Sequence, residues 1–154
     1  MTTDFSEKEK EVLVLEIVDA CIQYSKEHGE TFQQVLEKSV FVGEAREGIS
    51  EMVCKTMESL HTKGYIEGTV ELSYQSDIDQ ETWEESPTDT IDFERINFED
   101  ISISAKGKVF LGSETLKALG KGFIEKARPI IEAIAINTIG NTVSKGISAI
   151  IVSV

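Results

Sequence analysis

The chain has 154 residues, of which 28 are acidic, 15 are basic and 40% are hydrophobic, and its formal net charge is −13. This length suits one compact domain, and the hydrophobic content is enough for a packed core, so a wholly disordered chain is excluded. The acidic excess argues against a protein that holds nucleic acid by bulk charge, because that affinity comes from neutralising phosphates with Lys and Arg.

The charges are unevenly distributed along the chain. Residues 1–104 carry 25 acids and 8 bases, a net charge of −17, whereas residues 105–154 carry 3 acids and 7 bases, a net charge of +4. A difference of this kind indicates either different partners for the two parts or docking of one part on the other.

Three helices are predicted in the first 64 residues. Ser6 and Glu9 form a capping-box pattern before a long apolar run that ends at Gly29. The breadth of that run predicts a helix that is buried on two sides. A shorter helix is predicted at about 30–40. A third helix shows one continuous apolar stripe over residues 45–60 and ends at Gly64.

Cys21 and Cys54 lie inside these apolar helices, which predicts buried free thiols in a reducing compartment. A disulfide that joins the two helices is the alternative. The acidic and polar start of the chain shows no secretory signal, and we therefore expect a cytoplasmic protein.

The apolar period changes to two after the third helix. Residues 65–74 are predicted to form a strand, residues 75–90 an acidic loop, and residues 91–104 a second extended stretch with a bulge or turn near Arg95 and another near Glu99 and Asp100. Together, residues 65–103 predict a two- or three-stranded antiparallel hairpin. Ser104 is expected to cap a short helix. Pro129 is expected to kink a following helix or to start a new one.

Two strings carry a resemblance to a known family. They are Met57-Glu-Ser-Leu-His-Thr-Lys-Gly-Tyr-Ile-Glu-Gly68 and Ile101-Ser-Ile-Ser-Ala-Lys-Gly-Lys-Val-Phe-Leu111. With the order of elements, they resemble the small YjcQ-like winged-helix proteins of bacterial and phage genomes. The resemblance covers about 6–112 and implies an α+β fold with a winged helix-turn-helix domain there. The residues themselves indicate a long acidic wing at about 71–100 and a C-terminal helical segment at 113–154. The resemblance also implies a phage or mobile-element protein.

Winged helices usually bind DNA through the third helix, and Arg46, Ser50 and Lys55 are the candidate contacts on this chain. The wing opposes this role, because residues 71–100 hold 11 acids and one base, Arg95. An acidic wing repels the phosphates beside it. A DNA-binding transcriptional regulator is therefore retained only as an alternative function.

Patterns that carry catalysis are not evident. We find no Ser-His-Asp arrangement, no nucleophile elbow and no glycine loop that would cradle a phosphate, and His28 and His61 have no partners at metal-ligand spacing. The sequence thus predicts a protein that is not an enzyme and that needs no cofactor or metal.

The acidic tip of the hairpin has several interpretations. A solvated loop is the simplest, and the alternatives are calcium binding and mimicry of a nucleic-acid backbone toward a basic protein. Trp83 within this loop is a candidate anchor for a protein partner, unless it folds back onto the sheet.

The last part of the C-terminal segment, residues 129–154, has more apolar positions than a winged-helix domain needs. It could pair with a second copy of the chain, dock on its own domain, or meet a membrane with help from the basic residues before it. We favour a homo-oligomer and a non-catalytic interaction or regulatory module. The predicted interface residues are Ile130, Ile131, Ile134, Ile139, Val143, Ile147 and Ile150.

Overall fold

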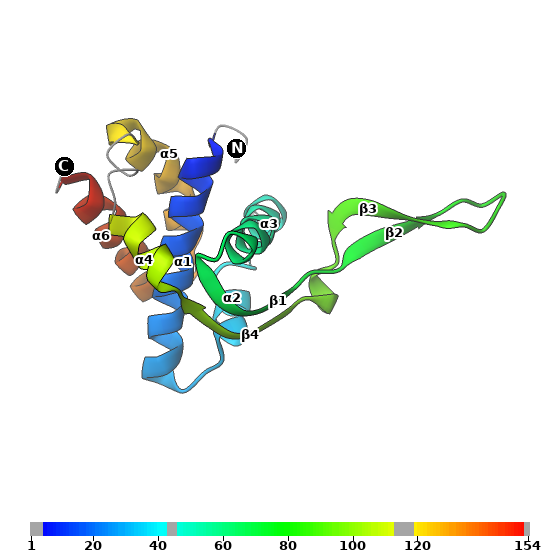
Figure 1. Cartoon of the computed structure of the whole chain (residues 1–154), viewed down its shortest axis with the longest axis horizontal. Helices are drawn as coiled ribbons and strands as arrows, with labels where there is room; N and C mark the ends of the chain where they lie inside the picture. Colours follow the sequence, from blue (N-terminus) through cyan, green and yellow to red (C-terminus); the bar gives the residue numbers. More distant parts are fainter. Residues whose placement is uncertain (1–4, 43–45, 113–118, 153–154) are drawn as a thin grey trace.

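The structure is a computed structural model, and it describes residues 5–42, 46–112 and 119–152. Helices form a body, and a two-stranded arm leads away from it (Figure 1). The mixture of helices and small antiparallel sheets is compatible with the predicted α+β class. The elements in chain order are α1 (Glu7–His28), α2 (Phe32–Ser39), α3 (Arg46–Thr62), β1 (Ile66–Glu71), β2 (Tyr74–Ile78), β3 (Glu85–Ile91), the 3-10 turn η1 (Phe93–Arg95), β4 (Asn97–Ile103), α4 (Ala105–Gly112), α5 (Gly120–Ala133) and α6 (Asn137–Val152).

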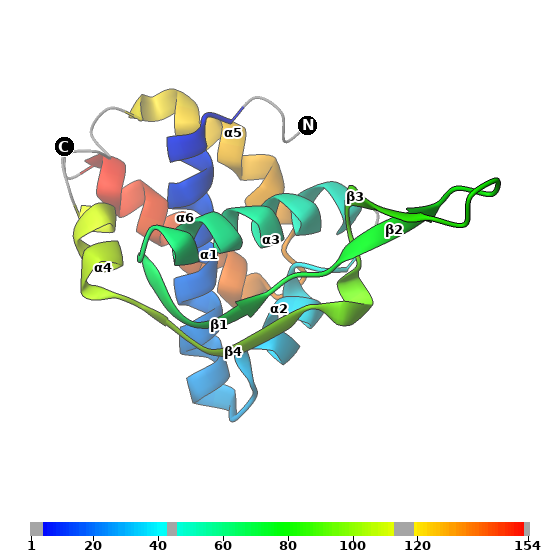
Figure 2. The same cartoon turned by 45° about the vertical axis from the view of Figure 1, so that its right-hand side comes forward.

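Helix α1 runs through the centre of the body, with α2, α3 and α6 packed against it (Figure 2). Its predicted capping box is confirmed: the Glu9 amide donates to Ser6 Oγ at 3.1 Å, and the Ser6 amide donates to Glu9 Oε1 at 2.9 Å. The helix ends at Gly29 as expected. The apolar side chains from Val12 to Val18 are at most 1% exposed, which confirms a helix surrounded by the core.

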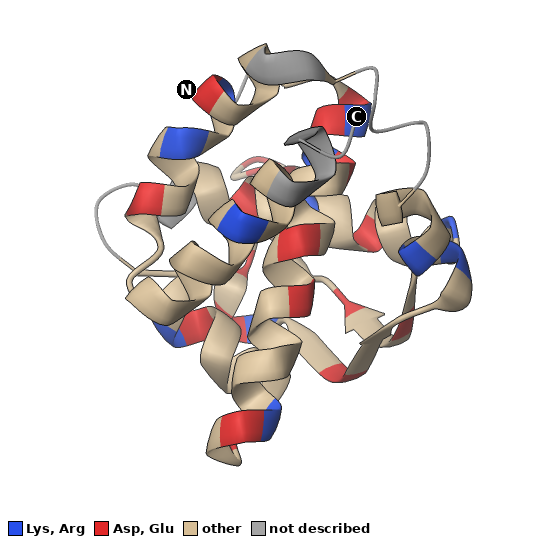
Figure 3. Ribbon diagram, turned by 90° about the vertical axis from the view of Figure 1, so that its left-hand side faces the viewer, with Lys and Arg blue, Asp and Glu red and all other residues tan. Residues whose placement is uncertain are grey.

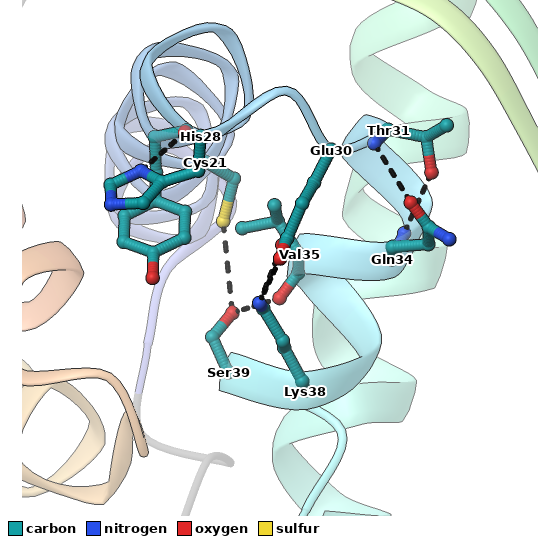
Figure 4. A network of polar contacts seen from close by, with 9 residues as sticks. Cys21, His28, Glu30, Thr31, Gln34, Val35, Lys38 and Ser39 are labelled. Atoms are coloured by element: carbon teal, nitrogen blue, oxygen red, sulfur yellow. Dashed lines mark hydrogen bonds and ion pairs between the residues drawn. The ribbon is translucent and has the colours of Figure 1, made fainter.

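The junction of α1 and α2 is held by a local polar network (Figure 4). Thr31 and Gln34 form a second capping box, and Lys38 donates to Glu30 Oε1 at 2.6 Å. The hydroxyl of Ser39 donates to the carbonyl of Val35 and lies 3.9 Å from Cys21 Sγ. Cys21 and Cys54 are both buried and free, so the predicted thiols are confirmed and the alternative disulfide is not formed.

Strands β1 and β4 form an antiparallel pair with the predicted irregularity. The register shifts between Glu67 and Thr69, opposite Asp100, whose φ is +53°. Gly68 has a φ of +110° and passes so close to the carbonyls of Glu99 and Asp100 that a Cβ atom would collide with them. A glycine is therefore required at the bulge.

The outer edge of β4 is capped by a side chain. Gln33 of α2 accepts a hydrogen bond from the Phe98 amide at 2.8 Å and donates to the Ile96 carbonyl at 3.3 Å. These are the groups to which one residue of a neighbouring parallel strand would bond. The Gln33 amide thus replaces a third strand at this sheet edge.

The predicted acidic loop at 75–90 is wrong, because most of it forms β2 and β3. Strand β1 ends at Glu71, the chain bends, and β2 pairs with β3 in a second antiparallel sheet. Both faces of this ribbon lie in solvent, so it lacks the alternation of apolar and polar residues that identifies a half-buried strand. The turn predicted near Arg95 is confirmed as η1, where Asp92 accepts a hydrogen bond from the Glu94 amide at 3.1 Å.

Helix α4 begins as predicted, with Ser104 Oγ accepting from the Gly107 amide at 3.0 Å. Helix α5 passes through Pro129 and ends at Ala133, so the expected new helix at Pro129 is wrong. The helical structure is instead interrupted at residues 134–136, before α6 begins.

The C-terminal helices dock on the chain's own core, which is one of the three arrangements expected for this segment. Five of the proposed interface side chains are no more than 5% exposed, because α6 packs against both α1 and α5: Ile130, Ile134, Ile139, Val143 and Ile147. Ile131 is half-buried, and the side chain of Ile150 lies outside the described residues. These five side chains therefore lie in the core of a single chain in this structure.

Two charged groups of α1 lie against this docked segment. Lys126 of α5 pairs with Glu9 at 3.1 Å, which joins the basic part of the chain to the acidic part. Burial alone would raise the pKa of Glu9, but hydrogen bonds from Ser6 and Lys126 outweigh it and hold that pKa below its usual value. Glu16 is 8% exposed and lies so close to Gly146 of α6 that a Cβ atom there would collide with its carboxylate. Burial, with a smaller contribution from Asp19, raises the pKa of Glu16 to about 7.

Candidate functional site: the acidic hairpin arm

The arm consists of β2, β3 and the turn between them, residues 74–91. Its base is anchored by the Asp92 amide, which donates to the Ser73 carbonyl at 2.8 Å, and by Ile91, which is 1% exposed. Beyond this base every residue from 75 to 86 is exposed. The arm therefore presents both faces of a ribbon to solvent (Figure 1).

The turn at the end of the arm is closed by Asp79. The Asp79 amide donates to the Glu84 carbonyl at 3.0 Å, and the Asp79 carbonyl accepts from the Trp83 amide at 2.7 Å. The Asp79 carboxylate accepts from the Glu81 amide at 2.9 Å. This network holds the turn in a defined shape and determines where Trp83 points.

Trp83 combines two unfavourable properties. Its side chain is 77% exposed, and its backbone has a φ of +59°, a left-handed conformation that bulky residues rarely adopt. Such a conformation costs about 1–3 kcal/mol and persists only where the surrounding structure imposes it. The indole does not fold back onto the sheet, so that interpretation of Trp83 is wrong. Its role as an anchor for a protein partner stays a prediction.

The apolar surface of the arm is larger than the sequence indicated. Among the described residues the exposed large hydrophobic side chains are Trp83, Ile78, Val109 and Val42, and the first two lie on the arm. Ile78 is 51% exposed and pairs with Glu85 across the ribbon. Ile78 was not predicted as a contact residue. It stands among polar residues, in a strand that was itself not predicted.

The charge of the arm is entirely negative. Residues 74–91 hold six acids and no Lys or Arg. The acids predicted at the tip, which are Asp77, Asp79, Glu81, Glu84, Glu85 and Asp89, all lie on this ribbon and are exposed. By contrast, basic and acidic residues are interspersed on the helices at the opposite end of the molecule (Figure 3). The arm is thus a single-sign surface with two apolar side chains near its end.

The predicted DNA contacts do not form a basic surface. Ser50 is 0% exposed, with its hydroxyl in the core rather than on the outer face of α3, which corrects its assignment. Lys55 is exposed, but it pairs with Glu51 at 2.7 Å, and this hydrogen bond raises its pKa. The side chain of Arg46 lies outside the described residues. Of the two candidates whose side chains are described, Ser50 is therefore not placed to contact a phosphate, and Lys55 is paired with an acid.

The two cysteines and the possible metal ligands were considered as carriers of chemistry. Burial raises the pKa of both Cys21 and Cys54 to about 12, which leaves neither as a reactive thiolate. Within residues 5–42, 46–112 and 119–152, no three His, Cys, Asp or Glu side chains gather as metal ligands. His28 Nδ1 and His61 Nε2 each lie within about 3 Å of a backbone carbonyl, at 3.0 and 2.9 Å.

The helices described here include none with the length and hydrophobicity needed to cross a membrane. No family model matches the chain, and no similar protein was found among curated proteins or solved structures. The resemblance to YjcQ-like proteins thus stays a prediction from the two strings that carry it.

Proposed function

We propose that this chain is a non-catalytic protein-interaction module, built on a winged-helix body, that binds a partner through the acidic arm. The partner is a protein with a basic surface and an apolar pocket. The observation that carries this proposal is Trp83, which is held in a costly left-handed conformation and presented to solvent among six acids.

The physical argument rests on what an exposed tryptophan contributes. Trp residues are enriched among the few side chains that dominate binding energy, because a large rigid ring is desolvated with little loss of side-chain entropy. Acids around the anchor steer a basic partner and fix its orientation. Ile78 adds apolar area next to the anchor.

The sequence-based alternatives receive less support. The arm takes the place of a wing, and its six acids would repel the phosphates that dominate DNA affinity. A membrane or a second copy would need the apolar face of the C-terminal helices, and that face is buried against α1.

A capture experiment with matched variants tests the proposal. The immobilised full-length chain, Trp83→Ala and Val109→Ala are each exposed to a lysate of the native cell. Val109 is the control, because it is 69% exposed and lies on α4 away from the arm (Figure 2). Proteins retained by the wild type and by the Val109 variant, but not by the Trp83 variant, are identified and purified.

Binding is then measured with the purified partner. We expect Trp83→Ala to weaken binding by about 2 kcal/mol or more, and affinity to fall with added salt. If Trp83→Ala retains the same proteins with the same affinity as the wild type, the arm is not the binding element.

A further inference from the structure

The two outer edges of the arm differ, and the hydrogen bonds between β2 and β3 show which backbone groups each edge offers. On β2 and at its ends, odd-numbered residues face β3: the Ser73 carbonyl accepts from Asp92, the Gln75 carbonyl accepts from Thr88 Oγ1 at 2.8 Å, and the Asp79 amide donates to Glu84. Neighbouring residues of a strand point their backbone groups in opposite directions. The amides and carbonyls of Ser76 and Ile78 therefore point outward, away from β3.

The outer edge of β3 is closed to a further strand. Pro87 pairs with Ser76, a position whose backbone groups point outward. Proline has no amide hydrogen, so β3 lacks a donor at the middle of its outer edge. Proline and charge are common devices that protect sheet edges from pairing.

The outer edge of β2 has no such protection. It contains no proline, its single charged residue is Asp77, and it ends at the exposed Ile78. No other described strand pairs with it, because the second sheet consists of β2 and β3 alone. A strand that paired there would run toward Trp83 at the turn.

The charge of the arm selects the occupant of this edge. A second copy would place one arm of net charge −6 against another, and like charges on adjacent strands are destabilising. A basic strand gains favourable cross-strand pairs instead.

We propose that the outer edge of β2 accepts an extended, lysine- or arginine-rich segment of the partner protein as a third strand of the arm. This inference rests on the proposed function and adds its binding mode: the backbone of Ser76 and Ile78 supplies hydrogen bonds, and Trp83 supplies the anchor. Strand addition of this kind gives affinity through the main chain and specificity through alternate side chains.

The test uses the full-length chain and a short blocked peptide of alternating lysine and valine as the probe. Its dissociation constant at low ionic strength is measured for the wild type, Ser76→Pro, Ser76→Ala and Trp83→Ala. Ser76→Pro removes an outward amide and leaves the β2–β3 hydrogen bonds in place, while Ser76→Ala controls for loss of the hydroxyl. Cross-strand nuclear Overhauser effects between Asp77 and Ser86 check that the arm still forms. A second peptide, N-methylated on alternate residues, tests the same bonds without changing the protein.

We expect Ser76→Pro and the methylated peptide each to weaken binding by about tenfold or more, with Ser76→Ala near the wild type. We also expect the amides of Ser76 and Ile78 to gain protection from hydrogen exchange. The inference is overturned if the probe does not bind, or if Ser76→Pro and Ser76→Ala bind equally. If Ser76→Pro and the methylated peptide leave the dissociation constant unchanged while Trp83→Ala still weakens binding, only the strand-addition mode is wrong. If neither Ser76→Pro nor Trp83→Ala weakens binding of the probe, the result counts against the proposed function as well.

Discussion

Replacing Glu16 with glutamine tests how the C-terminal helices are held on the core. Glu16 is buried beneath Gly146 of α6, and burial raises its pKa from 4.5 to about 7. Between these two values the folded chain binds more protons than the unfolded chain. The contribution of Glu16 to the free energy of unfolding therefore falls as the pH rises from 4.5 to about 7. Outside that window this contribution does not change with pH.

The size of the effect follows from the pKa difference. One pKa unit corresponds to about 1.4 kcal/mol, so the ionised carboxylate costs the fold about 3 kcal/mol above pH 7. Glutamine has nearly the same shape and no charge. We expect Glu16→Gln to stabilise the protein by up to about 3 kcal/mol at about pH 8.5 and to change little at about pH 4.5.

Urea unfolding followed by circular dichroism across this pH range measures the difference between variant and wild type. Other titrating groups cancel in that difference. Glu27→Gln is the matched control, because Glu27 is exposed on the same helix and should give a difference near zero at each pH. A Glu16→Gln difference that does not change with pH, or a destabilised variant at about pH 8.5, would refute the reasoning.

Three further outcomes are expected. Gln33→Ala should lower the free energy of unfolding by about 1–3 kcal/mol in urea, because the Phe98 amide and Ile96 carbonyl lose their partner; an unchanged midpoint would mean that water replaces it. The fluorescence of the single tryptophan, Trp83, should be quenched more strongly by caesium than by iodide, because acids surround it. Equal quenching at low salt would contradict a negative electrostatic field around the indole. Cys21 and Cys54 should react with a thiol reagent only after urea unfolding, and labelling of the folded chain would show that the core opens there.

Local signals in the sequence predicted much of the body. The capping box at Ser6 and Glu9, the stripe of α3, the bulge opposite Asp100 and the Ser104 cap depend on residues close in sequence, and each is confirmed. The role of Gln33 was not predictable, because its partners on β4 lie more than 60 residues away.

The candidate site was predicted only in part. The acidic residues and Trp83 indicated that this segment is unusual. Its strands were not predicted, because a ribbon exposed on both faces has no buried side that would create an alternation of apolar and polar residues. The arrangement of the C-terminal segment was left open among three alternatives. Its apolar positions are real, but a single sequence does not distinguish a face that docks on its own α1 from one that meets a second copy.

The exposure of the arm has a consequence for how the protein can diversify. Residues 75–86 are all exposed, so substitutions there leave the packing of the body unchanged, whereas most side chains of α1 are fixed by their neighbours. A two-stranded ribbon of this kind is only marginally stable by itself, and its shape depends on its base and its turn rather than on the residues between them. Substitutions along the ribbon can therefore change its surface chemistry while the helical body stays the same.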